Sequence, residues 1–257
     1  MKTIAISGKG GTGKTTVAAL IIRWLSEQVS KSILAVDADS NVNLNDVLGV
    51  ELKETIGSIR EEMKSSVSNL PGGMNKNQFL EYKIQSSLVE TPDYDLIAMG
   101  RPEGPGCYCY ANNLLREILN TLHKNYQFVV IDNEAGMEHL SRRTAHRLDY
   151  LLIISDPSLR GIRTAGKISR LLKELDTRVG EKYLVLNRVL DSIPPSVKKA
   201  IEEEGVEHLY SIPEDERLFI LDQSGKPIWT IASDTTARRA VGQLTRKLLN
   251  LEKEGKL

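Results

Sequence analysis

Residues 3–16 read TIAISGKGGTGKTT, an apolar run followed by a glycine-rich loop and two threonines that open an amphipathic stretch. This order of strand, loop and helix is the setting in which a Walker A loop binds phosphate. Its glycines let backbone N–H groups converge on phosphate oxygens, and the positive end of the helix favours negative charge. Lys14 is placed to reach the terminal phosphates and Thr15 to bind magnesium. The residues predicted to bind the nucleotide are Gly8, Lys9, Gly10, Gly11, Thr12, Gly13, Lys14, Thr15 and Thr16. The alternative is a glycine turn that only joins strand to helix.

Continuous apolar runs recur along the chain, at residues 3–7, 33–37, 95–99, 128–132, 150–155 and 183–187. Such runs are typical of strands buried on both faces. Amphipathic segments such as 15–29 and 161–176 lie between them, so strands alternate with helices. The pattern predicts an α/β fold, the three-layer P-loop NTPase fold with a mostly parallel central sheet flanked by helices. Residues 40–93 interrupt the alternation, but no glycine- or proline-rich linker divides the chain, so we expect one domain over 1–257 that ends in a closing helix.

The charge of the chain is balanced, with 34 acidic and 34 basic residues. This balance predicts neither a basic face for nucleic acid nor a positive patch for an anionic membrane. The N-terminal residues also lack the long apolar stretch of a signal peptide or a transmembrane helix. We therefore expect a cytoplasmic protein that has neither nucleic acid nor membrane as a partner.

Carboxylates follow two of the apolar runs, in VDADSN at 36–41 and in FVVIDNEAG at 128–136. Ligands of open α/β sheets collect at the carboxyl ends of strands, so these acids should face the phosphate loop. Asp132 has the position of a Walker B acid, which helps to hold magnesium. Asp37 and Asp39 have an alternative role, because acids often cap the segment that follows them.

Lys9 is not needed for phosphates that the rest of the loop already holds. With Lys9, the loop resembles the deviant Walker A motif of the MinD, ParA and nitrogenase iron protein superfamily, in which this lysine reaches the nucleotide of the opposite subunit. The resemblance implies an ATPase that forms a nucleotide-dependent homodimer. It also implies that Asp39 orients the attacking water with support from Asp37, and that Gly136 is the hinge of a switch segment. Asn133 stands where many relatives have threonine, so a hydroxyl contact at that position does not carry over.

Two later segments, VLNRV at 185–189 and IPEDERL at 212–218, resemble the adenine-pocket segments of the same ATPases. The resemblance places Asn187 and Pro213 at the base. An amide can both donate to and accept from the edge of adenine, which would favour ATP over GTP. From the residues alone, Asn187 could equally be a turn residue at the end of a strand.

The chain has two cysteines, both within GPGCYCYANN at 104–113. Extended backbone sends residues i and i+2 to one face, so the thiolates of Cys107 and Cys109 can bind the same metal ion. Two thiolates do not complete a four-ligand site, and a symmetric homodimer would supply the second pair. Thiolates suit zinc, copper(I), nickel or an iron–sulfur cluster, and the residues leave that choice open. Alternatively, the cysteines are small apolar side chains in a loop.

The segments GPGCYCYANNLLR and DNEAGMEH, together with the loop that carries Lys9, resemble the CooC and AcsF group of maturation ATPases. These ATPases serve nickel carbon monoxide dehydrogenase and acetyl-CoA synthase. The resemblance implies an ATP-hydrolysing metallochaperone that binds nickel, or zinc, at Cys107 and Cys109 and assists nickel insertion into one of these client enzymes. A second interpretation is a MinD- or ParA-like switch that positions DNA or proteins at a surface. A third, electron transfer as in nitrogenase iron protein, is disfavoured because that family's cysteines lie far apart in sequence.

Overall fold

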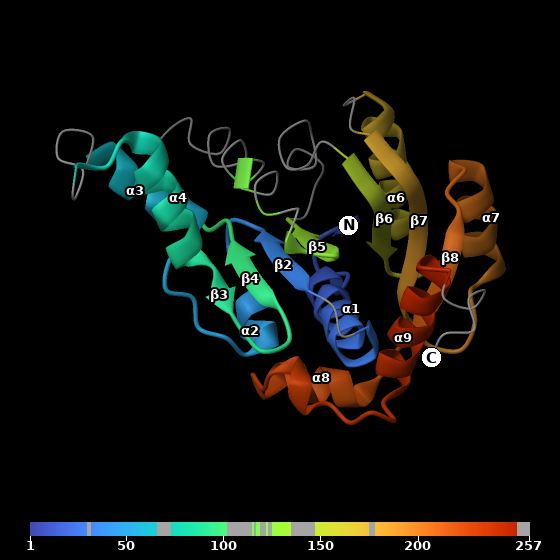
Figure 1. Cartoon of the computed structure of the whole chain (residues 1–257). Helices are drawn as coiled ribbons and strands as arrows, with labels where there is room; N and C mark the ends of the chain where they lie inside the picture. Colours follow the sequence, from blue (N-terminus) through green and yellow to red (C-terminus); the bar gives the residue numbers. More distant parts are fainter. Residues whose placement is uncertain are drawn as a thin grey trace.

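A single sheet forms the centre of the protein (Figure 1). The structure is a computed structural model, and it describes residues 1–29, 32–65, 73–101, 115, 117–118, 122, 125–134, 147–174 and 178–250. The described strands are β1 (Lys2–Gly8), β2 (Ile33–Ala38), β3 (Val89–Glu90), β4 (Asp95–Ala98), β5 (Phe128–Asn133), β6 (Arg147–Ser155), β7 (Arg178–Val189) and β8 (His208–Pro213). They form an eight-stranded sheet in the order β3-β4-β2-β5-β1-β6-β7-β8. Only the pairing of β3 with β4 is antiparallel among these described strands.

Helices follow most of the strands. Their bounds are α1 (Lys14–Val29), α2 (Leu44–Leu48), α3 (Ile56–Ser65), α4 (Lys76–Ser87), α6 (Leu159–Glu174), α7 (Pro195–Glu204), α8 (Glu216–Gln223) and α9 (Thr236–Leu248), with a short 3-10 helix η3 (Ile228–Thr230) before α9. Within the described ranges, no helix has both the length and the apolar character needed to cross a bilayer.

Both faces of the sheet are buried, which explains why the strand sequences are continuously apolar. Successive residues of a strand point to opposite faces. On β1, Ile4 and Ile6 therefore pack with α1, α2 and α9, whereas Ala5 between them packs with α6 and α7. The sheet is the middle layer of three, and the predicted fold class is confirmed.

All six predicted runs coincide with strands, and the helices expected at 15–29 and 161–176 are α1 and α6. In the interruption at 40–93, the described residues contain three short helices and the two-residue β3, which carries too little pattern to be recognised. The predicted closing helix is α9, and residues 251–257 of the predicted frayed end lie outside the described residues.

Strand order places the phosphate loop at the centre of the sheet. The chain leaves β1 toward β2 on one side and later reaches β6 on the other side, so β1 lies next to the point where the winding reverses. Ligands of open α/β sheets bind at such a point, beyond the carboxyl ends of the strands. The loop at residues 9–13 starts there.

Candidate functional site

The phosphate loop leaves β1 through a glycine that no larger residue can replace without strain. Gly8 has φ of +149°, and a Cβ at this position would lie 2.2 Å from the carbonyl oxygen of Ile154 on the neighbouring strand β6. The close approach lets β1 pack tightly beside β6 and still turn sharply into the loop. This geometry explains the glycine at the end of the first apolar run.

Hydrogen bonds within the loop close it around the start of α1. The Thr12 hydroxyl donates to the carbonyl oxygen of Lys9 over 2.8 Å, and the ammonium of Lys14 donates to the same oxygen over 3.2 Å. Lys14 is buried, whereas Lys9 is exposed. The two lysines therefore differ in environment, as expected if only Lys14 serves the phosphates of its own chain.

The electrostatics of the loop are set by one buried cation among carboxylates. Burial lowers the pKa of Lys14, and the negative charges of Asp132, Asp39 and Glu134 offset part of this effect. The negative charges favour the ammonium form of Lys14, and burial opposes it. An anionic ligand at the loop would add a further negative charge that favours the ammonium form.

Asp132 is the last residue but one of β5 and lies beside the loop, where the strand register places it opposite Asp37 of β2 and Ile6 of β1. Burial is the main cause that raises the pKa of Asp132 to about 7, and the carboxylate of Asp37 adds to it, while a hydrogen bond from the Thr15 hydroxyl and the charge of Lys14 act in the opposite direction. One carboxyl oxygen of Asp132 is buried without a hydrogen-bond partner among the described residues. A buried carboxyl oxygen of this kind is suited to a cation.

Magnesium fits this donor set. It prefers oxygen ligands and usually binds through one or two protein groups, several waters and the phosphates of a substrate. Thr15 and Asp132 provide hydroxyl and carboxyl oxygens at one place. Within the described part of the chain, no three His, Cys, Asp or Glu side chains gather to hold a metal by themselves. A magnesium ion here would therefore depend on phosphates and water for its other ligands.

Asp37 and Asp39 differ in what they contact. Both oxygens of Asp37 accept backbone N–H groups, from Asp39 over 3.0 Å, from Asn43 over 2.9 Å and from Leu44 over 2.8 Å. Asp37 is fully buried, and burial raises its pKa while these hydrogen bonds offset part of the rise. The capping alternative thus describes Asp37, which holds the N-terminal end of α2.

Asp39 is half-buried and accepts the N–H of Asn41 over 2.8 Å. It lies close enough to Lys14 and Asp132 to act on the pKa of both. Its other carboxyl oxygen takes part in no hydrogen bond between described residues that would fix it elsewhere. Its position beside the loop is compatible with the water-orienting role that the sequence predicts.

A cavity of about 220 Å³ opens beside the loop, between the ends of β7 and β8 and helix α8. Its walls include both residues predicted at the base, Asn187 and Pro213. The other residues that line it include Gly13, Thr16, Val17, Arg188, Leu218 and Phe219. A neighbouring cavity of about 370 Å³ shares Thr16, Leu218 and Asp222 with it and extends toward α2. Helix α8 therefore forms a wall of both cavities.

Several predicted residues lie outside the part of the chain that the structure describes. These are Cys107 and Cys109, the proposed metal ligands, and Gly136, the proposed hinge. One side chain that contacts the loop was not predicted. Arg188 has a left-handed backbone with φ of +59° and donates from its guanidinium to the Gly11 carbonyl over 3.3 Å. Its only signal in the sequence is its place directly after Asn187.

Comparison with known proteins agrees with this geometry. Residues 1–185 match the protein family described as the AAA domain. The chain belongs to the AAA domain family. This AAA domain protein is 43% identical over 249 residues to an uncharacterised ATP-binding protein of Methanocaldococcus jannaschii. The aligned residues cover 96% of this chain and 98% of the relative.

Two further relatives are more distant. The AAA domain protein is 28% identical over 236 residues to the carbon monoxide dehydrogenase accessory protein CooC of Rhodospirillum rubrum, over 86% of this chain and 87% of CooC. It matches the solved structure of the Pyrococcus furiosus cell division ATPase MinD with a TM-score of 0.71 and 25% identity, over 97% of this chain and 99% of that chain. The fold is that of the MinD-like P-loop ATPases.

Proposed function

We propose that the protein binds ATP with magnesium and hydrolyses it to ADP and phosphate. The observation that carries this proposal is the meeting of Lys14, Thr15 and Asp132 at the phosphate loop, with the carboxylate of Asp39 close to the first and last of these. A relative that is 43% identical and described as ATP-binding supports the choice of nucleotide. The cavity at Asn187 and Pro213 supports a place for the base.

Each residue has a separate task in the proposed mechanism. The N–H groups of the loop and the ammonium of Lys14 hold the phosphates, and they favour the charge that develops as the terminal phosphoryl group leaves. Thr15 and Asp132 would hold magnesium, which would neutralise charge on the phosphates. Asp39 accepts a hydrogen bond from the attacking water and so orients it toward the terminal phosphorus.

The test is ATP turnover by the purified protein. We expect slow, magnesium-dependent hydrolysis that is nearly abolished in Lys14→Ala and in Asp39→Ala, because gripping the phosphate and orienting the water are separate requirements. Lys199→Ala, which removes an exposed lysine of α7, is the control and should keep wild-type turnover. Undiminished turnover in either site variant would refute the assigned roles.

We also propose a homodimer that forms when nucleotide binds. The exposed position of Lys9 on the rim of the loop supports a contact with a second chain, as the resemblance to the MinD superfamily implies. Lys9→Ala should bind ATP as the parent does and remain more monomeric in sedimentation with a non-hydrolysable analogue. Equal dimerisation of the variant and the parent would contradict this role.

For the biological role, we propose a nickel metallochaperone that serves carbon monoxide dehydrogenase or acetyl-CoA synthase. Two observations support it, the Cys-x-Cys pair at Cys107 and Cys109 and the 28% identity to a carbon monoxide dehydrogenase accessory protein. A site shared across the dimer predicts one nickel ion per two chains, with affinity that falls at low pH because thiolates must be deprotonated. The Cys107→Ser, Cys109→Ser double variant should lose the metal and keep ATP binding; retained metal affinity would show that the thiols have another purpose.

The second candidate is a MinD- or ParA-like switch that positions DNA or proteins at a surface, which the similarity to a cell division ATPase over nearly the whole chain favours. It predicts that the ATP-bound protein sediments with liposomes or with DNA. The metallochaperone proposal predicts neither. Pelleting assays in ATP and in ADP, beside the nickel titration, distinguish the two.

A further inference from the structure

The end of strand β7 is joined to the phosphate loop by a buried side chain. The amide nitrogen of Asn187 donates to the carbonyl oxygen of Thr12 over 2.8 Å. The contact is close, because a Cβ on Gly13 would lie 2.5 Å from that nitrogen. Asn187 therefore packs directly against the backbone that must surround a phosphate.

Arg188, the next residue, holds the other end of the same amide. Its backbone N–H donates to the amide oxygen of Asn187 over 3.0 Å, and its guanidinium donates to the carbonyl of Gly11 over 3.3 Å. The left-handed backbone of Arg188 is uncommon for a residue that is not glycine, asparagine or aspartate, and such a conformation persists only where the surroundings hold it. Two consecutive residues of β7 thus bind two consecutive carbonyls of the loop.

The direction of these carbonyls matters for phosphate binding. A loop can bind an anion only if its N–H groups converge, and its carbonyl groups must then find donors elsewhere. The carbonyl of Lys9 is served from within the loop, by Thr12 and Lys14. The carbonyls of Gly11 and Thr12 are served from outside it, by the guanidinium of Arg188 and the amide of Asn187.

We propose that Asn187 and Arg188 are positioning residues for the phosphate loop, which they hold in its anion-binding shape from the end of β7. This inference rests on the proposed binding of ATP and goes beyond it, because it assigns to Asn187 a task at the phosphates and not only at the base. With its oxygen bonded to Arg188 and one amide hydrogen bonded to Thr12, the amide of Asn187 keeps one N–H and one lone pair for a base. The base cavity and the phosphate loop would thus share one side chain and respond to each other.

The two roles of Asn187 are separated by a ligand that has no base. Magnesium tripolyphosphate presents the phosphate chain of ATP alone, so a residue that only reads the base cannot affect its binding. We expect Asn187→Ala to weaken magnesium tripolyphosphate by a factor of about ten, since a loop carbonyl loses its donor and the loop its preorganised shape, and to weaken ATP by at least that factor, because ATP also loses the contact of this amide with its base. Calorimetric titration of both ligands measures the two factors. Leu190→Ala is the matched control, a neutral truncation of an exposed side chain three residues further along that lines neither cavity.

A tripolyphosphate affinity that is unchanged in Asn187→Ala, while wild-type protein binds ATP, would overturn this inference and leave the proposed ATP binding intact. Wild-type protein that binds neither ligand would overturn both. The thermal midpoint without ligand shows whether Asn187→Ala is folded.

Arg188→Ala gives an independent test, because the guanidinium is exposed and its loss should not impair folding. We expect about threefold weaker binding of both ligands. A lost charge and a lost hydrogen bond respond differently to salt, because screening removes the first and not the second. A loss that persists at about 0.5 M KCl supports the positioning role, and a loss that disappears there would overturn it for Arg188.

Discussion

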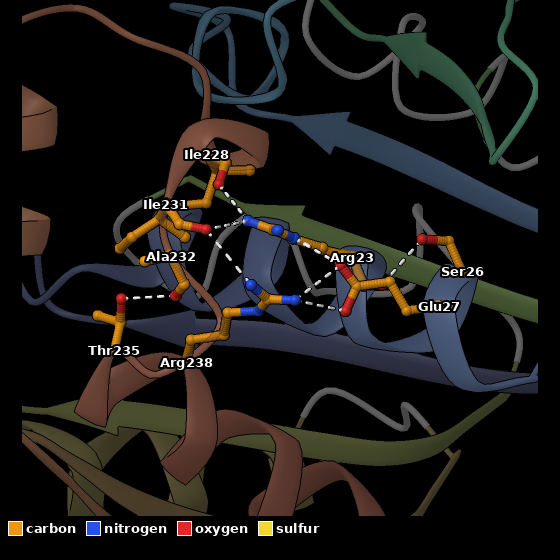
Figure 2. Close-up of polar contacts among 8 residues, drawn as sticks. All are labelled: Arg23, Ser26, Glu27, Ile228, Ile231, Ala232, Thr235 and Arg238. Carbon is orange, nitrogen blue, oxygen red and sulfur yellow. Dashed lines mark hydrogen bonds and ion pairs between the residues drawn. The ribbon is translucent and has the colours of Figure 1, made fainter.

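One buried arginine, Arg23, joins helix α1 to the segment before α9, and we expect its contacts to contribute measurably to the free energy of unfolding. Arg23 is 8% exposed and donates to three acceptors: the carboxylate of Glu27 over 2.8 Å, and the carbonyls of Ile228 and Ile231 over 2.7 and 3.1 Å. Figure 2 shows the guanidinium between α1 and the turn that leads from η3 into α9. It also lies 5.6 Å from the ring centre of Trp229.

The magnitude for Arg23→Met follows from these contacts. Methionine keeps much of the apolar stem, so the loss is mainly polar. Hydrogen bonds to a charged group contribute about 1.5–3 kcal/mol each, but two terms reduce the net effect. In the variant, the carbonyl of Ile228 still accepts the N–H of Ile231, and the carbonyl of Ile231 still accepts a hydrogen bond from Arg238. The variant also has no buried charge whose desolvation would oppose folding. We expect a loss of about 2 kcal/mol in the free energy of unfolding.

Urea unfolding followed by far-UV circular dichroism measures this loss, as a lower midpoint at an unchanged slope. The control is Arg170→Met, which breaks an ion pair with Glu204 on a side chain that is 55% exposed and should change stability by less than about 0.5 kcal/mol. Arg238 bonds both oxygens of Glu27, so removing both arginines should destabilise by more than the sum of the single losses. Equal effects of Arg23→Met and Arg170→Met, or strict additivity in the double variant, would refute the reasoning.

Three further predictions concern stability. Burial would raise the pKa of Glu27, but hydrogen bonds from Arg23 and Arg238 lower it below the usual value. The stabilisation from this carboxylate is therefore present above its unfolded pKa and is lost as the pH falls through its folded pKa. Glu27→Gln should lower the thermal midpoint at pH 7 and much less near pH 3, and an equal effect at both pH values would contradict the pairing. Gly8→Ala should lower the free energy of unfolding, measured in urea, by about 3 kcal/mol because the new Cβ would clash with the Ile154 carbonyl. The control Gly205→Ala should lower it by about 1 kcal/mol, since φ is also positive there but nothing lies within 4 Å of the new Cβ. Asp37→Asn should cost about 1–3 kcal/mol in thermal unfolding, since one amide oxygen cannot accept three N–H groups, and unchanged stability would argue against the cap.

The sequence predicts the central sheet well because its strands are buried on both faces, which leaves an unbroken apolar run at each. Where a strand is not fully buried, the signal weakens. Strand β8 has one fully buried residue, Ile212, and its sequence HLYSIP mixes polar with apolar side chains. The antiparallel β3 is too short to have a pattern at all.

The same contrast holds for the site. Asp132 and the phosphate loop could be placed from sequence, because both follow buried strands whose carboxyl ends meet at one edge. Capping by Asp37 was one of the alternatives that the residues left open, and Asp37 does accept N–H groups at the start of α2. The contact of Arg188 could not be predicted, because its guanidinium reaches a carbonyl that lies 177 positions away in the chain. Such partners depend on tertiary packing and leave no local spacing to read.

The two edges of the sheet bear on how copies of this chain can assemble. Among the described strands, one edge is β3, which offers only two residues for pairing. The other is β8, against which α9 packs and where Lys247 donates to the carbonyl of Leu209 over 3.2 Å. A long open edge is what two chains need in order to join their sheets by backbone hydrogen bonds, and a very short or a covered edge resists it. Self-association of this protein should therefore leave each sheet separate and bring the chains together through side chains and loops, so concentrating the protein should add no new strand signal in its infrared amide spectrum.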